Sequence, residues 1–241
     1  MSKEFKELME KSLEGLPIRL NTRQTEQFEQ FYLDLVETNK VMNLTAITEK
    51  NEVIRKHFAD SLEIIRAVPD LAEKPYQILD LGTGAGFPGI PMAIVWPNLQ
   101  LFLLDSVSKK LRFVEKEGKE LDLKNIKIFH GRCEDLANDP EHREKYDICV
   151  SRAVANLSTL SEYCIPFVHK NGVFIPYKTE NIDFELKNAK NALAKLGGTV
   201  RNIIRFSLPE EGDRSLAVIE KTGITPKCYP RKAGIPSKQP L

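Results

Sequence analysis

Residues 78–89, with the sequence Ile-Leu-Asp-Leu-Gly-Thr-Gly-Ala-Gly-Phe-Pro-Gly, constrain the fold more than any other stretch of this 241-residue chain. A short apolar strand reaches Asp80, three closely spaced glycines follow, and a helix is predicted to begin near Pro88. Glycine accepts the positive φ angles of a tight turn, and its lack of a side chain lets a ligand approach the backbone. The segment therefore predicts a strand, a turn and a helix that together bind an adenosine-containing cofactor.

The glycine pattern fits two classes of cofactor. Residues 84–89 match the Gly-x-Gly-x-x-Gly fingerprint of dinucleotide-binding folds. The same stretch also contains Asp80-x-Gly82-x-Gly84-x-Gly86, the acidic pattern typical of methyltransferases that use S-adenosylmethionine. The turn alone leaves both alternatives open.

From Tyr76 onward, short apolar strands alternate with helical segments. This alternation predicts a doubly wound α/β fold, in which helices cover both faces of a largely parallel sheet. The predicted strands are Gln77–Leu81, Gln100–Asp105, Ile126–His130, Tyr146–Ser151 and Gly172–Tyr177, with helices near 88–96, 108–122, 134–138 and 156–168.

The last two predicted strands decide between the cofactors. After a helix near 183–196, the strands Thr199–Ser207 and Arg214–Lys221 are separated by a short gap that contains Pro209 and Gly212. The gap is too short for a helical crossover and predicts an antiparallel hairpin. A mostly parallel sheet that ends in such a hairpin is typical of class I S-adenosylmethionine-dependent methyltransferases. A dinucleotide-binding fold usually has a sixth parallel strand instead, so the hairpin favours S-adenosylmethionine.

The two ends of the chain differ from this central part. Apolar residues at three- and four-residue spacing predict helices in residues 1–70, an N-terminal extension packed on a methyltransferase domain at 71–222. Residues 223–241 form a basic tail whose prolines are predicted to keep it extended. Together with Arg152, Lys178, Arg201 and Arg205, the tail could supply a local basic surface for RNA through Lys227, Arg231, Lys232 and Lys238.

Composition excludes several other classes of protein. With 35 basic and 34 acidic residues the net charge is +1, which is unlike a protein that binds nucleic acid through bulk charge. The four cysteines are scattered without zinc-ligand spacing, so we expect reduced thiols and no metal. We also expect a monomeric, cytoplasmic protein with no membrane partner, since the chain shows neither a signal-peptide core nor a bilayer-spanning apolar run.

Ligands of an open α/β sheet bind beyond the carboxyl ends of its strands, so the residues that follow each strand are the candidates for the cofactor site. Gly82 and Gly84 would lie against the methionine part of the cofactor, with Phe87 as an apolar neighbour. Asp105, at the end of the second strand, would accept hydrogen bonds from ribose hydroxyls. A simple cap on the following helix is the alternative for Asp105.

The third strand leads to a pair of acidic residues, Glu134 and Asp135. Glu134 is the first candidate to accept a hydrogen bond from the exocyclic amine of adenine, and Asp135 is the second. The alternative is a solvated helix start, where acidic residues are common.

Two cations follow the fourth and fifth strands, where the methyl acceptor would bind. The chain lacks the Asn-Pro-Pro-aromatic run of many amine methyltransferases, and Cys149 lies in mid-strand, unlike a reactive nucleophile for pyrimidine carbon 5. A ring nitrogen such as guanine N7 remains, and its lone pair needs no base. Arg152 and Lys178 would then be the catalytic residues, holding the guanine oxygen and phosphates. A purely structural ion pair is the alternative for each.

Several strings in the chain resemble one protein family. They are Asn-Leu-Thr-Ala-Ile at 43–47, His-Phe-Ala-Asp-Ser-Leu at 57–62, the glycine turn continued to Pro91, Ser-Arg-Ala at 151–153, and Tyr-Pro-Arg-Lys-Ala-Gly-Ile-Pro at 229–236. Together they resemble the bacterial family of 16S ribosomal RNA guanine-N7 methyltransferases, formerly called glucose-inhibited division protein B. The resemblance implies a class I fold with an N-terminal helical extension and S-adenosylmethionine as the donor. It also implies a guanine near the decoding centre as the acceptor, in naked 16S rRNA or in the 30S subunit.

The resemblance implies site residues as well. The cofactor would be bound by Gly82, Phe87, Asp105, Cys133, Glu134 and Arg152. Cys133 would act through its backbone, because relatives often have alanine there. His57, Asp60 and Ser61 match a family string whose plain interpretation is a helix face packed on the catalytic domain. An NAD-dependent oxidoreductase and a non-catalytic RNA-binding module are the alternatives from other functional classes.

Overall fold

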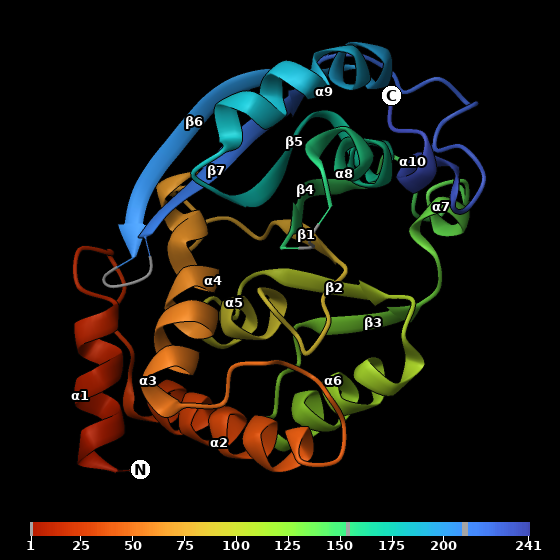
Figure 1. The fold of residues 1–241 in the computed structure, drawn as a ribbon. Coiled ribbons are helices and arrows are strands. Elements are labelled where there is room, and N and C mark those ends of the chain that lie inside the picture. The colour runs from red at the N-terminus through yellow and green to blue at the C-terminus, as the bar shows by residue number, and fades with distance from the viewer. Residues whose placement is uncertain (1, 153–154, 209–211) are drawn as a thin grey trace.

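The computed structural model describes residues 2–152, 155–208 and 212–241. In this part of the chain one seven-stranded sheet has the strand order β3-β2-β1-β4-β5-β7-β6 (Figure 1). Strands β1 to β5 pair in parallel, and β7 lies antiparallel between β5 and β6. The strands are β1 Gln77–Leu81, β2 Gln100–Asp105, β3 Ile126–His130, β4 Tyr146–Ser151, β5 Val168–Thr179, β6 Gly198–Leu208 and β7 Gly212–Lys221.

The predicted strands and the terminal hairpin are confirmed, and the last three strands are longer than predicted. Strand β5 begins at Val168, before the predicted start at Gly172. The turn of the hairpin at Pro209 and Ala153 of the Ser-Arg-Ala string lie outside the described residues. The topology places a switch point between β1 and β4, where an open α/β sheet binds its ligand.

Helices cover both faces of the sheet, and each face has its own apolar core (Figure 1). Alternate residues of one strand point to opposite faces, so Leu101 and Leu103 belong to one core while Phe102 and Leu104 belong to the other. The first core also contains α5 (Gly89–Val95) and α6 (Ser108–Glu120), and the second contains α8 (Leu157–Cys164) and α9 (Ile182–Leu196). The short helix α7 (Cys133–Leu136) follows β3, and a 3₁₀ turn at Ile165–Phe167 precedes β5.

The N-terminal extension is helical as predicted. It consists of α1 (Lys3–Ser12), α2 (Thr22–Asn39), α3 (Lys50–Val53), a π-helical turn at Ile54–Ala59, α4 (Asp60–Leu62) and a 3₁₀ turn at Glu63–Arg66. Asn21 caps helix α2: its side chain accepts from the backbone amide of Gln24, while the Gln24 side chain accepts from the backbone amide of Asn21. The third predicted helix, after Thr48, is interrupted by the π-helical turn between α3 and α4. The spacing of its apolar residues did not reveal this interruption.

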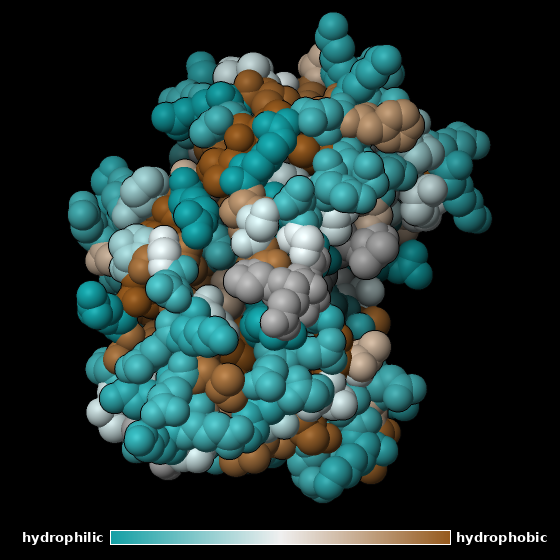
Figure 2. Space-filling model, turned by 60° about the vertical axis from the view of Figure 1, so that its left-hand side comes forward, coloured by the Kyte–Doolittle hydropathy of each residue, from teal (hydrophilic) through white to brown (hydrophobic). Residues whose placement is uncertain are grey.

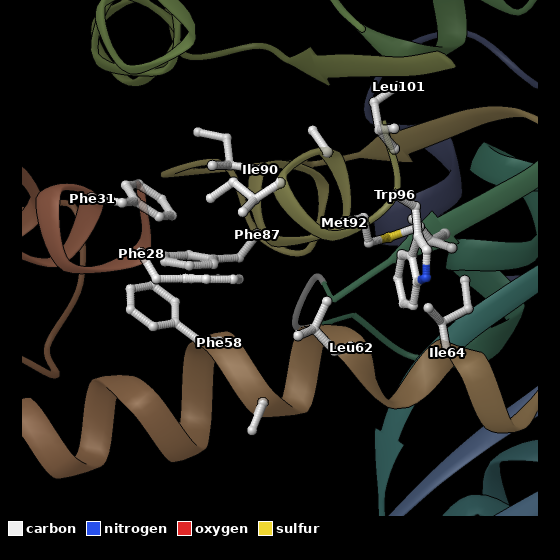
Figure 3. Close-up of a cluster of buried hydrophobic side chains, with 14 of the residues drawn as sticks. Phe28, Phe31, Phe58, Leu62, Ile64, Phe87, Ile90, Met92, Trp96 and Leu101 are labelled. Atoms are coloured by element: carbon white, nitrogen blue, oxygen red, sulfur yellow. The ribbon is translucent and has the colours of Figure 1, made fainter. Parts of the chain in front are cut away.

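An aromatic cluster joins this extension to the sheet (Figure 3). Phe28 and Phe31 of α2 meet Phe58 of the π-helical turn, with ring centroids 5.0 and 5.5 Å apart, and Phe31 lies 5.2 Å from Phe87 of the glycine turn. These residues share one apolar core with the strands, so packing is continuous across residue 70. The domain boundary at that residue stays a prediction.

The C-terminal tail is not extended as predicted. Residues Ile235–Lys238 form a short helix, α10, and the segment before it lies beside α7 and α8 (Figure 1). The side chains of Arg231 and Arg143 donate hydrogen bonds that hold it there, to the Glu162 carboxylate and to the carbonyl of Tyr229. Proline spacing predicted the tail wrongly because these contacts link residues far apart in the chain.

The helices and one face of the surface bear on whether the protein contacts a membrane or an apolar partner. None of the helices in the described ranges is long and apolar enough to cross a bilayer. Figure 2, which brings the side of α1 and β6 forward, shows a mainly hydrophilic face on which apolar residues are broken up by polar ones. An open α/β sheet binds its ligands beyond the carboxyl ends of its strands, so the hollows at that edge are the candidate sites.

Candidate active site

The turn after β1 adopts the conformation that its glycines predict. Gly82, Gly84 and Gly86 have φ angles of 76°, 60° and 95°, a region that other residues rarely adopt. The amides of Gly82 and Thr83 both donate to the carbonyl oxygen of Leu104, at 2.8 and 3.1 Å. A Cβ atom on Gly86 would lie 2.4 Å from Cδ1 of Ile90. The turn thus requires glycine for conformation and for packing against α5.

The acidic residue of the motif holds this turn together. Asp80 is fully buried, and its Oδ2 accepts from Oγ1 of Thr83 at 2.7 Å and from the amide of Gly89 at 2.9 Å. Burial raises the pKa of Asp80 to about 7, although these two hydrogen bonds favour the ionised form. Asp80 therefore fixes the start of α5 behind the turn.

A cavity of about 740 Å³ lies beyond the ends of β1, β2 and β3. Four of the predicted cofactor-binding residues line it: Gly82, Asp105, Cys133 and Glu134. We call it the donor cavity.

Asp105 connects the glycine turn to the donor cavity. Its Oδ2 accepts from the amide of Gly84 at 2.9 Å, and its Oδ1 accepts from the amide of Val107 at 2.8 Å. Val107 precedes α6, so Asp105 closes the turn before α6, although no side chain of the described residues caps that helix, and its carboxylate lines the cavity; the role in ribose binding stays a prediction. Gly84 contributes through this backbone contact.

Glu134 is buried at the far side of the donor cavity, whereas Asp135 is exposed. The amide of Gly234, from the C-terminal tail, donates to Oε1 of Glu134 at 3.2 Å. The Cys133 thiol lies 3.3 Å from Oε2, and burial together with the Glu134 carboxylate raises the pKa of this thiol. Cys133 thus stays a protonated thiol rather than a nucleophile.

Phe87 lies outside the group that lines the donor cavity. Its ring stacks on His57 at a centroid distance of 4.6 Å and belongs to the aromatic cluster of Figure 3. The sequence shows that an aromatic residue lies in the turn, but it does not show to which side of the turn the ring points. The cofactor role predicted for Phe87 stays a prediction, and its visible role is to join the turn to the N-terminal extension.

Arg152 lies in a second hollow, of about 540 Å³, beside the end of β4. We call it the acceptor cavity. Its lining also includes Asp60, Tyr177, Lys178 and Arg214, so the cavity brings together β5, β7 and the N-terminal extension.

The π-helical turn holds the Arg152 guanidinium. Nη1 donates to Oγ of Ser61 at 2.8 Å and to the carbonyl of His57 at 3.1 Å, while Nη2 donates to the carbonyl of Lys56 at 2.8 Å. Asp60 completes the set, with Oδ2 at 3.2 Å from Nη2. The wider winding of a π-helix changes which carbonyls bond within the helix, and such turns recur at functional sites. The string at 57–62 is therefore more than a packed helix face, because it positions Arg152.

The pKa values of His57 and Asp60 are both shifted in this arrangement. Burial and the neighbouring Arg152 charge lower the pKa of His57 to about 3, so its imidazole is neutral at physiological pH. Its Nε2 lies 2.8 Å from Oγ1 of Thr45, a residue of the 43–47 string. Burial raises the pKa of Asp60, while Arg152 acts in the opposite direction.

Lys178 is held by an internal ion pair. Its Nζ lies 2.8 Å from Oε2 of Glu185 and donates to the carbonyl of Ala155 at 2.6 Å. The same Glu185 oxygen accepts from the amide of Leu157 at the start of α8. These contacts support the structural interpretation of Lys178, and a direct catalytic role for Lys178 or Arg152 stays a prediction.

The strand order and the antiparallel hairpin at the end of the sheet are those of the class I methyltransferase fold. Similar solved structures include an O-methyltransferase described for Klebsiella pneumoniae, with a TM-score of 0.56 and 11% identity over 91% of this chain and 98% of that one. The ribosomal protein L11 methylase of Lactobacillus delbrueckii subsp. bulgaricus has a TM-score of 0.51 and 16% identity over 70% and 80%. At these identities the likeness concerns the fold.

Sequence similarity is far more specific. A model of the family described as rRNA small subunit methyltransferase G matches residues 24–216, and the chain belongs to this family. Ribosomal RNA small subunit methyltransferase G of Lachnoclostridium phytofermentans is 49% identical over 236 residues, which cover 95% of this chain and 94% of the relative. The protein of the same name from Brevibacillus brevis is 44% identical over 98% and 99%. The resemblance is thereby confirmed, and the oxidoreductase alternative is wrong.

Proposed function

We propose that this protein transfers the methyl group of S-adenosylmethionine to N7 of a guanine in 16S rRNA near the decoding centre. The observation that supports this most is the position of the donor and acceptor cavities at the carboxyl ends of neighbouring strands. Family membership supplies the class of RNA. Without the specific strings and relatives, the fold alone would leave the acceptor open.

The residues around the donor cavity fit the proposed cofactor. Each carboxylate oxygen of Asp105 accepts one backbone hydrogen bond and keeps a second lone pair for a ribose hydroxyl. Oε2 of Glu134 faces the thiol of Cys133, a weak donor, and can accept from an adenine amine. The glycine turn leaves its backbone open to the methionine part. When bound, S-adenosylmethionine supplies an electrophilic methyl group.

The chain's own contribution to the acceptor side is position and charge. Guanine N7 carries a lone pair, so the reaction needs no general base. The lowered pKa of His57 agrees with this, because it keeps the imidazole beside Arg152 neutral. Arg152 is held by four groups of the extension, one of which is the Asp60 carboxylate, so its guanidinium forms a rigid floor of the acceptor cavity. A preorganised cation of this kind stabilises the oxygen edge of a guanine without reorganising.

Methyl transfer from labelled S-adenosylmethionine tests this proposal. We expect one methyl group on guanine N7 when 16S rRNA or 30S subunits from a strain lacking the enzyme are the substrate, and mapping identifies the nucleotide. Glu134→Gln should raise KM for S-adenosylmethionine, while Glu141→Gln, at an exposed acid of the same region, should not. Label on another base, or RNA binding without transfer as the RNA-binding alternative predicts, would contradict the proposal.

A further inference from the structure

The C-terminal segment 229–239 reaches the wall of the donor cavity. Gly234 lines this cavity together with Glu134 and with Tyr163 of α8. Figure 1 shows α10 beside α7 and α8, on the side of the sheet opposite α1. An extended basic tail, as the sequence predicts, would not contact the cavity, so the role of these contacts has to be explained.

A buried ion pair anchors the segment to α8. Nη2 and Nε of Arg231 donate to the Glu162 carboxylate at 2.6 and 2.9 Å, and the backbone amide of Arg231 donates to Oε1 at 2.8 Å. The Glu162 side chain is fully buried, so Arg231 is the charge that compensates it. Leaving a buried carboxylate without its partner strongly destabilises a protein. The two side-chain nitrogens of Arg231 that donate to Glu162 form a fork that only arginine offers.

Two further side chains, Thr159 and Arg143, hold the same segment and the residues just before it. Oγ1 of Thr159, also on α8, donates to the carbonyl of Pro236 at 3.0 Å. Arg143 donates to the carbonyls of Thr225 and Tyr229, each at 2.9 Å. The backbone between these contacts, which includes Gly234, is therefore held in one place.

Gly234 is the residue of the anchored segment that contacts Glu134 in the donor cavity. Its φ of 82° lies in the left-handed region, and its amide donates to Oε1 of Glu134. This main-chain donor fixes the orientation of the carboxylate, and Oε2, whose neighbour is the weakly donating Cys133 thiol, keeps a lone pair for a ligand.

We propose that segment 229–239 orients Glu134 for the adenine of the donor, and that Arg231, acting through Glu162, is a positioning residue for donor binding. The inference rests on the proposed function. It also removes Arg231 from the basic surface predicted for RNA, whereas Lys227, Lys232 and Lys238 remain exposed.

Titration of the full-length protein with S-adenosylhomocysteine tests the inference. Loss of a hydrogen bond to a charged group predicts that Arg231→Gln raises Kd about tenfold. Arg231→Lys, which keeps the charge but not the fork of donors, should give an intermediate Kd. Lys232→Gln removes the same charge from the neighbouring exposed position and should leave Kd unchanged. In turnover, KM for S-adenosylmethionine should rise while kcat and KM for RNA stay close to wild type.

Arg231→Gln leaves Glu162 buried without its partner, so a double variant separates anchoring from folding. Glu162→Met with Arg231→Met removes both charges, and thermal melting should show a folded protein, because apolar replacement of a buried pair is often neutral. We expect this variant to show the same weakened binding. Unchanged Kd in a folded double variant would overturn the inference, as would lost RNA methylation at unchanged Kd. A wild-type protein that does not bind S-adenosylhomocysteine would instead overturn the proposed function.

Discussion

Both ends of the chain reach the same edge of the sheet, but they hold its side chains in different ways. The N-terminal extension holds Arg152 with backbone carbonyls, Ser61 and Asp60, and the C-terminal segment holds Glu134 with a single amide. The first contact is embedded in an aromatic core, whereas the second depends mainly on polar contacts such as Arg231–Glu162. Damage to the N-terminal contact should therefore cost stability and activity together, and damage to the C-terminal contact should cost donor affinity.

The largest expected effect tests the aromatic core of the N-terminal side. Phe58 is fully buried and touches Phe28, Phe31 and Phe87. Phe58→Ala should lower the free energy of unfolding by about 3–5 kcal/mol, because it removes a large side chain from a packed core. Urea unfolding measures the loss. Phe184→Ala, at an exposed phenylalanine of α9, is the control and should change stability by less than about 0.5 kcal/mol. A small effect of Phe58→Ala would mean that the extension is only loosely docked.

The next effect concerns the charge at the acceptor cavity. Arg152→Met removes the cation that pairs with the buried Asp60 and should destabilise the fold by about 3 kcal/mol. Methyl transfer should be almost abolished while S-adenosylhomocysteine still binds. Adding Asp60→Leu should restore much of the stability and none of the activity, as measured by urea unfolding and labelled methyl transfer. Activity that returns with stability would assign Arg152 a purely structural role.

The sequence predicted best those features that depend on short-range chemistry. The glycine turn was foreseen because positive φ angles require glycine, and the strands were foreseen because buried strands are short apolar runs. The hold on Arg152 was missed because a π-helical turn has no signature in apolar spacing. The string at 57–62 was the available signal, and it was interpreted only as packing. The folded tail was missed for a different reason: Arg231 and Glu162 lie 69 residues apart, and nothing local pairs them.

A third prediction tests ionisation beneath the N-terminal extension. Glu117 of α6 is fully buried, and burial, helped by Asp34 and Glu120, raises its pKa to about 8, against the effect of Lys116. Between the unfolded value near 4.5 and this folded value, the folded protein binds the extra proton, so stability is greatest at low pH and falls as pH rises. Ionisation of Glu117 should lower the free energy of unfolding of the wild type by about 2 kcal/mol between pH 6 and 8, and Glu117→Gln should abolish this part of the pH dependence.

Urea unfolding at a series of pH values measures this slope. Asp80 has a raised pKa as well, so part of the slope should remain in the variant. Glu115→Gln, on the exposed side of the same helix, should leave the slope unchanged. Equal slopes for wild type and Glu117→Gln would show that the Glu117 carboxylate ionises normally.

The smallest expected effect gives the sharpest contrast between the two ends. Ser61→Ala removes one of the hydrogen bonds to the Arg152 guanidinium and leaves the carbonyls of Lys56 and His57 and the Asp60 carboxylate in place. Stability should fall by about 1 kcal/mol and kcat by roughly fivefold, because the guanidinium is slightly less fixed. KM for S-adenosylmethionine should not change, since Ser61 lies in the extension and not at the donor cavity. Arg231→Gln should do the opposite, raising this KM at nearly constant kcat. If both variants shifted the same kinetic constant, the two ends of the chain would act on one common element rather than on separate cavities.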